Sequence, residues 1–256
     1  MNMTKNFERF APIAVLVLIL LLWQATVSLF NIAEYIFPSP LQIAKEFVEF
    51  KEPLMKAAWQ TFWVTMVGFA IAIVVGVLLG FIVGSSPMAY AAFYPLMVGF
   101  NAVPKAAIVP ILVVWFGIGI GPGILTAFLI SFFPITVNIA TGLATLEPEL
   151  EDVLRVLGAK RWDILTKIGL PRCMPYFYGS LKVAITLAFV GTVLAEMTAG
   201  DSGIGSLMQT AGSQQRLPLA FAGLVLISGM AMAMYEFFSY IEKHTTAWAH
   251  RGSQNH

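Results

Sequence analysis

Charged residues are scarce in this sequence. Asp, Glu, Lys and Arg make up 11% of its 256 residues, whereas about a quarter of the residues of a soluble domain are charged. Hydrophobic residues make up 58%, and the mean hydropathy is +0.80. This composition predicts a protein that crosses a membrane several times. The net charge of +1 is not gathered into a basic stripe, so a nucleic-acid partner is excluded.

The sequence also lacks the residue patterns for an internal disulfide, a nucleotide-binding P-loop and a complete serine-protease site. The single cysteine, Cys173, cannot form an internal disulfide. A P-loop contains Gly-Lys followed by Ser or Thr to hold nucleotide phosphates, and no Gly-Lys dipeptide occurs here. "GDSG" at 200–203 matches the nucleophile box of trypsin-like proteases, but every histidine is expected across the membrane, about 30 Å away. We therefore expect no catalytic residue, no metal site and no cofactor in this chain.

The sequence does contain long apolar segments. A helix of about 20 apolar residues can cross a membrane, and six segments of roughly this length are predicted to do so: 10–30, 61–84, 89–116, 123–144, 176–199 and 217–240. The first is too long for the apolar part of a signal peptide and is expected to stay as an anchor. The predicted fold class is all-α integral membrane, with an anchor at 1–36, a transmembrane domain at 37–245 and a tail at 246–256.

Basic residues are distributed unevenly between the two sides. Six spans put both termini on one side, together with the segment at 147–171, and all three carry Lys and Arg. Positive residues favour the cytoplasmic side, so both termini and this segment are predicted to be cytoplasmic. The segment at 31–60 is then expected on the opposite face. Its apolar residues at 43, 47 and 50 have helical spacing, which predicts a helix lying at the interface with membrane lipid.

Glycines and prolines distinguish the second and third spans. The second span places four glycines on nearly one face: Gly68, Gly76, Gly80 and Gly84. Such a row lets two helices approach closely in lipid and predicts a packing face. The third span contains Pro104 and Pro110, each of which removes a backbone donor and bends a helix. Bent helices at membrane depth are tolerated where they line a cavity, so these spans are candidates for a translocation path.

The segment at 147–171 concentrates charges between two apolar spans. Four apolar residues in it recur at helical spacing: Leu150, Val153, Leu154 and Leu157. They predict a short amphipathic helix, which Gly158 would end by adopting positive φ. A second short helix is expected to end before Pro171. An amphipathic helix of this kind can dock in a groove of a soluble partner or rest on lipid headgroups, and its geometry leaves both possibilities open.

The same segment resembles a family motif. Four of its residues keep the spacing: Gly158, Ile168, Leu170 and Pro171. The pattern is that of binding-protein-dependent ABC importer permeases, which runs Glu-Ala-Ala, three residues, Gly, nine residues, Ile, any residue, Leu, Pro. Asp152 keeps the acid, whereas Val153 and Leu154 replace the two alanines. The stretches "FPSPLQI", "AVPKAAIVPILVVWFGIG", "LEPELEDVLRVLGAKRW" and "AEMTAGDSGIGSLM" resemble the nitrate, sulfonate and taurine branch of that family.

This resemblance implies a type I ABC importer permease fold in the bacterial cytoplasmic (inner) membrane. It implies a homodimer with separate cytoplasmic ATPase subunits, which bind ATP and Mg, and an extracytoplasmic substrate-binding protein. The permease itself would not be an enzyme, and its solute would be sulfonate-, taurine- or nitrate-like or a related organic compound. The implied ATPase-coupling residues are Asp152, Leu154, Leu157, Gly158, Ala159, Lys160, Arg161, Trp162, Ile168, Leu170 and Pro171.

Ionisable residues inside spans are costly and are therefore candidates for function. Lys105, which follows Pro104, and Glu196 in the fifth span are both expected in the outer half of the membrane. Together with Pro104 they are the predicted translocation-path residues. Lys105 is expected either to face the path, where it would suit an anion, or to pair with Glu196. Lys182 and Glu236 lie close enough to an interface to snorkel. The alternative function is a secondary carrier that uses Lys105 and Glu196.

Overall fold

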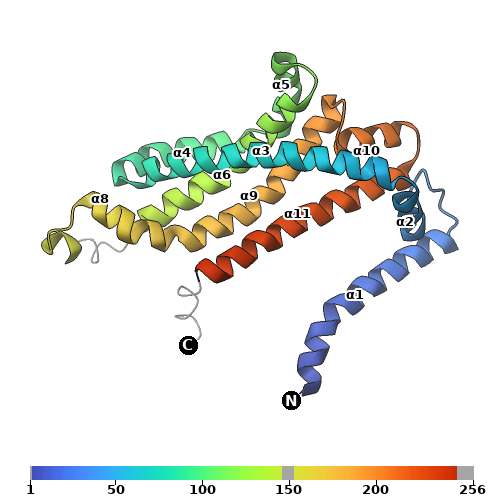
Figure 1. Ribbon diagram of the computed structural model, residues 1–256, viewed down its shortest axis with the longest axis horizontal. Coiled ribbons are helices and arrows are strands. Elements are labelled where there is room, and N and C mark those ends of the chain that lie inside the picture. Colours follow the sequence, from blue (N-terminus) through green and yellow to red (C-terminus); the bar gives the residue numbers. More distant parts are fainter. Residues whose placement is uncertain (1, 146–152, 247–256) are drawn as a thin grey trace.

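The computed structural model describes residues 2–145 and 153–246, and regular structure within these ranges is entirely helical. The elements are α1 (Asn2–Leu29), α2 (Pro40–Glu49), α3 (Lys51–Gly84), α4 (Pro87–Ala102), η1 (Lys105–Ile108), α5 (Val109–Phe116), α6 (Ile120–Ala144), α8 (Arg161–Ile164), η2 (Leu165–Gly169), α9 (Leu170–Ala199), α10 (Ile204–Ser213) and α11 (Leu217–Thr245). A further helical turn lies at 153–156. The bundle is elongated, with α2 and α10 at one end (the α10 end) and α8 at the other (the α8 end; Figure 1).

The number of spans agrees with the sequence. Five helices are long and apolar enough to cross a membrane, and α4 with residues 105–116 forms a bent pair that makes a sixth span. The third span is broken rather than curved, because it bends by 71° between its two helical parts. α4 ends at Ala102, and the amide of the next residue, Val103, donates to the carbonyl of Phe100 over 3.3 Å. Val103 itself is extended with ψ 127°, as favoured by the Pro that follows it.

The expected helix end before Pro171 is wrong. Residues 161–199 form one continuous helical stretch, in which η2 is a π-helical turn. In this turn the amide of Leu170 donates to the carbonyl of Leu165. A π turn adds one residue to the ring closed by the hydrogen bond. We attribute the tolerance of Pro171, which has no amide hydrogen, to this wider turn and to its place in the first turn of α9.

The core lies between α3, α6 and α9, with α10 and α11 packed against α9. The glycine row of α3 is a packing face, as expected, and it faces α6. A Cβ added to Gly80 would lie 2.8 Å from the carbonyl oxygen of Thr136, and one added to Gly84 would lie 2.8 Å from that of Ala140. Backbone therefore meets backbone along this contact, which gives close van der Waals packing where burial in lipid adds little drive.

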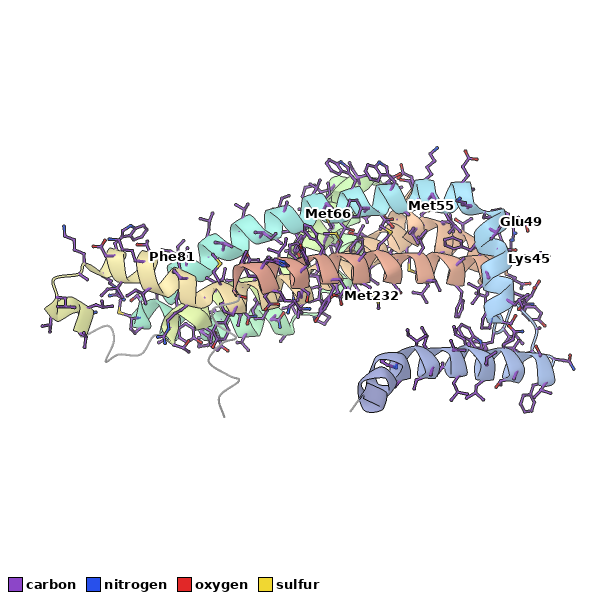
Figure 2. All side chains as sticks on the ribbon, turned by 60° about the horizontal axis from the view of Figure 1, so that its bottom comes forward. Lys45, Glu49, Met55, Met66, Phe81 and Met232 are labelled. Carbon is purple, nitrogen blue, oxygen red and sulfur yellow. The ribbon has the colours of Figure 1, made fainter. Side chains whose placement is uncertain are left out.

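Helix α2 covers the α10 end (Figure 1). The expected surface helix is present as α2, which begins with a capping box between Ser39 and Gln42. Arg216 holds α2 in place, since its Nη2 lies 3.0 Å from Glu46 Oε2 and its guanidinium lies over the ring of Phe50. Figure 2 shows α2, with Lys45 and Glu49 labelled, lying across the end of the bundle, whereas α1 runs apart from it. Among the described elements, α1 packs mainly on α2.

Candidate functional site: the coupling segment, the broken span and Glu196

The segment after α6 turns sharply at Gly158. The φ of Gly158 is +84°, which confirms the expected helix end. The amide of Ala159 donates to the carbonyl of Leu154 over 3.0 Å, and that of Gly158 donates to Arg155 over 2.9 Å. These two bonds form a Schellman motif, in which glycine avoids the steric cost that a side chain brings to positive φ. Asp152 and Leu150 lie outside the described residues.

Apolar side chains around this turn are exposed. Val153, Val156 and Leu157 are exposed, whereas Leu154 and Ala159 are half-buried. The predicted stripe of Val153, Leu154 and Leu157 is therefore divided between surface and interior. Figure 1 places this turn at the tip of the α8 end, where it projects from the bundle. Since the exposed group projects beyond the helices of its own chain, it is available to a partner.

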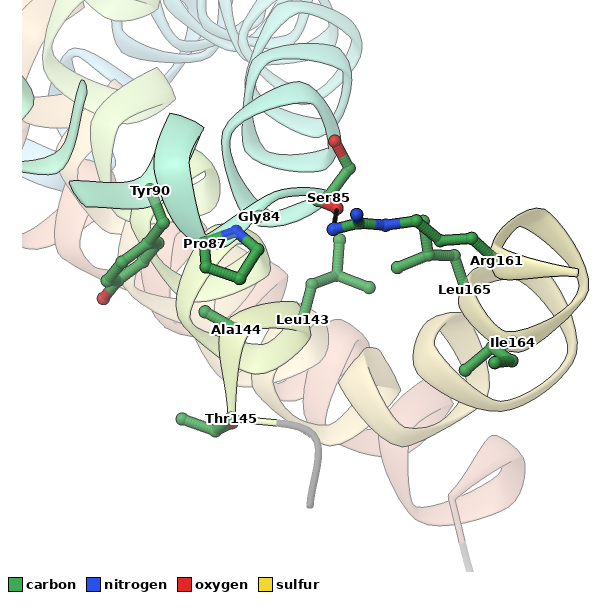
Figure 3. A pocket seen from close by; sticks show the side chains of 10 residues that line it. All are labelled: Gly84, Ser85, Pro87, Tyr90, Leu143, Ala144, Thr145, Arg161, Ile164 and Leu165. Atoms are coloured by element: carbon green, nitrogen blue, oxygen red, sulfur yellow. Dashed lines mark hydrogen bonds between the residues drawn. The ribbon is translucent and has the colours of Figure 1, made fainter. Parts of the chain in front are cut away.

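The next residues of the segment turn back onto the bundle. Arg161 Nη2 donates to the carbonyl oxygen of Ser85 over 2.5 Å, and the Trp162 ring packs edge-on against Phe81, with centroids 5.7 Å apart. Lys160 is exposed at the start of α8, Ile168 is half-buried, and Leu170 and Pro171 are exposed. A hollow of about 260 Å³ lies beside Arg161 (Figure 3). Its lining residues are Gly84, Ser85, Pro87, Tyr90, Leu143, Ala144, Thr145, Arg161, Ile164 and Leu165.

Lys105 lies at the break of the third span and does not pair with Glu196, so this one of the two alternatives for Lys105 is wrong. Its Nζ donates to the backbone oxygen of Asn101 over 3.0 Å and to the Oδ1 of Asn101 over 2.6 Å. It also lies 5.8 Å from the centre of the Phe133 ring. Lysine thus satisfies one of the free carbonyls at the C-terminus of α4, where a positive charge also suits the helix dipole.

The break itself is on the surface of the single chain. Residues 101–104, including Pro104, are all exposed. Next to it, α3, α4 and α6 enclose an apolar groove of about 300 Å³, lined by Leu79, Val83, Phe93, Leu96, Met97, Phe100, Phe132, Phe133 and Thr136. Irregular backbone at membrane depth is tolerated only against protein or a water-filled cavity. This face therefore does not suit direct contact with lipid.

Glu196 is buried at the α10 end and is hydrogen-bonded there. The hydroxyl of Thr61 lies 2.9 Å from both carboxylate oxygens, and the amide of Gly205 donates to Oε2 over 2.9 Å. The amide of Ile204 in turn donates to Thr61 Oγ1 over 2.8 Å. Glu196 and Thr61 thus satisfy two of the free amides at the N-terminus of α10. Gly203 approaches so closely, with φ +93°, that a Cβ there would overlap the carboxylate.

Lys182 was expected to snorkel, but it is paired. Its Nζ lies 2.6 Å from Glu242 Oε2, and both side chains are largely buried between α9 and α11. Glu236 is exposed on α11. Within the described ranges, no group of three His, Cys, Asp or Glu residues could hold a metal ion. Lys105 and Glu196 thus cap helix ends, and Lys182 links α9 to α11.

Known proteins resemble this chain over most of its length. Residues 72–246 match the family described as "Binding-protein-dependent transport system inner membrane component". The chain is 26% identical over 247 residues to the formylaminopyrimidine transport permease protein ThiX of Halalkalibacterium halodurans, covering 96% of this chain and 98% of that protein. It is 26% identical over 243 residues to the taurine transport system permease protein TauC of Escherichia coli, covering 92% of this chain and 88% of that protein.

A solved structure is similar as well. A chain of the inward-facing MetNI methionine ABC transporter superposes with a TM-score of 0.66 at 18% sequence identity. The match covers 75% of this chain and 96% of that chain. At this level of identity the similarity establishes a shared fold, and the family match over residues 72–246 adds the relationship in sequence.

Proposed function

This chain belongs to the family of binding-protein-dependent transport system inner membrane components, and from that premise we propose that it lines the translocation path of an ABC importer as a homodimer. Two separate cytoplasmic ATPase subunits would drive it, and an extracytoplasmic binding protein would deliver the solute. The all-helical fold is that of type I ABC importer permeases. ATP and Mg would be bound by the ATPase, because the sequence has no P-loop.

The α8 end is the cytoplasmic end in this proposal. Both termini and the segment at 147–171 carry the basic residues that favour the inner side of a bacterial membrane. The α10 end, with α2 across it, would then face the binding protein. Charges of both signs are interspersed along α2 and the start of α3, including Lys45, Glu46, Glu49 and Lys51, so this face would offer a mixed polar surface.

The observation that carries the proposal is the broken third span. Its exposed turn at 101–104 requires protein or water on this face, and a second copy arranged around a central path supplies both. Pro104 and Lys105 would then lie beside the path. Lys105 uses Asn101 as its partner, and its third amine hydrogen would remain for a solute.

The solute proposed is small and anionic, either inorganic or organic. Lys105 supplies the positive charge. The similar taurine permease is named for a solute that carries an anionic sulfonate group. A formylaminopyrimidine permease is equally similar at 26% identity, so selection is assigned mainly to the binding protein. We do not retain the secondary carrier, because Glu196 is buried as a helix cap and is not joined to Lys105.

Coupling to the ATPase is assigned to the turn at 153–158. Its exposed apolar residues would occupy a cleft on the ATPase surface, as amphipathic helices do in helix-in-groove recognition. Burying a side chain such as Leu157 is worth about 1.5 to 3 kcal/mol. Gly158 would act indirectly, since the Schellman motif sets the angle at which the exposed residues project.

Purification of the tagged chain from its host in mild detergent, with bound proteins identified by mass spectrometry, tests this assignment. A P-loop ATPase is expected with the wild type and is expected to be lost with Leu157→Asp. Leu157 is 76% exposed, so the substitution should leave the fold intact. Val48→Asp is the matched control, because Val48 is 75% exposed on α2 at the other end. Retention of the ATPase by Leu157→Asp would contradict the assignment.

A further inference from the structure

The predicted coupling residues divide into two groups that point to different neighbours. Val156 and Leu157 are exposed at the tip of the α8 end, whereas Arg161 and Trp162 reach the end of α3. Figure 3 shows the Arg161 side chain extending from α8 across the hollow to Ser85. The first group suits a partner protein. The second group contacts its own chain and calls for a separate explanation.

We propose that Arg161 and Trp162 form a strut, through Ser85 and Phe81, that transmits movement of the coupling segment to α4 and so to the broken span. The strut would not hold the ATPase. It would decide whether movement of the docked ATPase reaches the translocation path. This inference rests on the proposed function, and it assigns to Arg161 and Trp162 a positioning role inside the permease.

The Arg161 contact is placed where it can act on α4. Ser85 is the C-cap of α3, so its carbonyl belongs to the set that a helix end leaves without an intrahelical partner. A guanidinium donor makes a charge-assisted bond, which is roughly twice as strong as a neutral one. The first residue of α4, Pro87, follows Ser85 by two positions, and the linking residue Ser86 is extended with φ −142°. Movement of the Ser85 carbonyl is therefore passed directly to the start of α4.

Of the two helices joined at this turn, α4 is the less firmly held. It is joined to α6 by the Tyr90 hydroxyl, 3.3 Å from Thr141 Oγ1, and by an edge contact between the rings of Phe100 and Phe132. The last two turns of α3 pack by Gly80 and Gly84 against the backbone of α6, which ties α3 to α6. By contrast, α4 has no buried residue in the described chain. Only two residues, Val103 and Pro104, separate α4 from η1, where Lys105 begins. The 16 residues of α4 span about 24 Å, so this helix can carry a displacement from the α8 end to the break.

The hollow beside the strut leaves room for such movement. Pro87 and Tyr90, from the first turn of α4, line one side, and Arg161, Ile164 and Leu165 line the other. Its volume of about 260 Å³ means that the two sides are not close-packed there. The hydrogen bond from Arg161 crosses this space. A shift of α8 can therefore pull the α3–α4 turn through this bond without forcing side chains into one another.

The test measures movement of α4 in the assembled complex. A spin label is placed on α4 at Leu96, which is exposed, in a Cys173→Ser background, and the tagged chain is purified from its host with the ATPase bound. Distances between the labels of the two copies are measured by double electron–electron resonance, with and without Mg and a non-hydrolysable ATP analogue. In the otherwise wild-type chain the nucleotide is expected to shift this distance. If no ATPase is bound or no shift occurs in this reference, the proposed function fails rather than the strut.

Arg161→Ala is expected to keep the ATPase bound and hydrolysing ATP while the shift at Leu96 is lost. Arg161→Lys keeps a cationic donor and is expected to restore part of the shift. Lys167→Ala removes a positive charge from the same surface, where Lys167 pairs with Asp163, and should shift like the reference. A full shift in Arg161→Ala would overturn the proposal, as would loss of the ATPase from this variant with the fold intact, because Arg161 would then be a docking residue.

A second variant covers the case in which Arg161→Ala does not assemble. Phe81→Leu removes the ring contact with Trp162 from the α3 side and leaves the coupling segment unchanged. It is expected to reduce the nucleotide-dependent shift at Leu96 while ATPase binding is retained. An undiminished shift in this variant would contradict the strut. A merely stabilising contact would lower the Tm of the complex without changing the distance shift, so the two roles are separated.

Discussion

Some polar side chains in this chain are buried and hydrogen-bonded at points where the backbone of another segment lies close to them. Glu196 is the clearest case, because a buried carboxylate is costly unless it is hydrogen-bonded. Thr61 from α3 and the amide of Gly205 from α10 supply those bonds. Glycine at 203 leaves the space that the carboxylate fills. The sequence "AEMTAGDSGIG" thus encodes a helix cap that joins α3, α9 and α10.

Thr61→Val should destabilise the protein. The variant keeps the shape of the side chain but removes one donor to Glu196 and leaves the amide of Ile204 without its acceptor. Leaving buried polar groups unsatisfied costs about 2 kcal/mol, which should lower the Tm by several degrees. The measurement is thermal unfolding of the purified chain in detergent. Thr198→Val is the control, because Thr198 is exposed and bonds only its own helix at Leu194. Equal Tm values for the two variants would refute the capping role.

Whole elements are held together here by contacts between backbones. The α3–α6 pair shows this best, since the glycines of α3 bring its backbone against the backbone and the Cβ atoms of α6. In lipid, where burial of apolar surface gives little drive, such proximity supplies the van der Waals contact that stabilises a helix pair. The pair is closely packed, whereas α4 lies at its edge without buried residues. This contrast in packing underlies the assignment of α4 as the moving element.

Gly80→Ala should separate α3 from α6. The added Cβ would lie 2.8 Å from the carbonyl oxygen of Thr136 and from the Cβ of Ile139, so backbone must shift, at a cost of about 1 to 3 kcal/mol. Gly99→Ala is the matched control, because Gly99 is also helical but has nothing within 4 Å of the added Cβ. That change should be neutral or stabilising by up to about 1 kcal/mol, since alanine favours helix. The measurement is thermal unfolding of both variants in detergent. A higher Tm for Gly80→Ala than for Gly99→Ala would contradict close packing of α3 and α6 at Gly80.

At the scale of the whole molecule, a single chain leaves its broken span uncovered. The exposed turn at 101–104 and the apolar groove beside it lie on one face. Since irregular backbone does not suit lipid, a second copy and a water-filled path would cover this face in the proposed homodimer. The ATPase would act at the opposite extreme of α4, beyond the strut. In the proposed importer, energy input and the solute path would lie at the two ends of one loosely packed helix.

Labelling with a water-soluble thiol reagent distinguishes a path from a lipid face. In a Cys173→Ser background, Val103→Cys should react, because the break is expected to meet water. Val225→Cys on α11 should react slowly if that position faces lipid. Val103 is 42% exposed and Val225 is 55% exposed in the single chain, so exposure alone would predict faster labelling at Val225→Cys. Rates would be measured in intact membrane vesicles. Faster reaction at Val225→Cys would contradict the placement of the path.

Local patterns in the sequence were enough for the spans, the family and several turns. Hydropathy depends on composition over one helix length, so the six spans could be predicted, with the third recovered as the bent pair. Gly158 could be predicted because a positive φ is a property of one residue. The resemblance to the nitrate, sulfonate and taurine branch is confirmed by the family match and by the taurine permease. The glycine row could be predicted because helical spacing puts its members on one face.

Only the tertiary structure decided which distant residues meet. Glu196 and Thr61 are 135 residues apart, and Arg161 and Ser85 are 76 apart, so no local pattern links them. Charge and depth suggested a pair between Lys105 and Glu196, but the bonds formed by each depend on which helix end lies nearest. The continuation of the helix through Pro171 likewise depends on a π turn that no propensity specifies. Composition and periodicity determine how each segment meets the membrane, whereas packing between helices determines which polar groups are satisfied and which element can move.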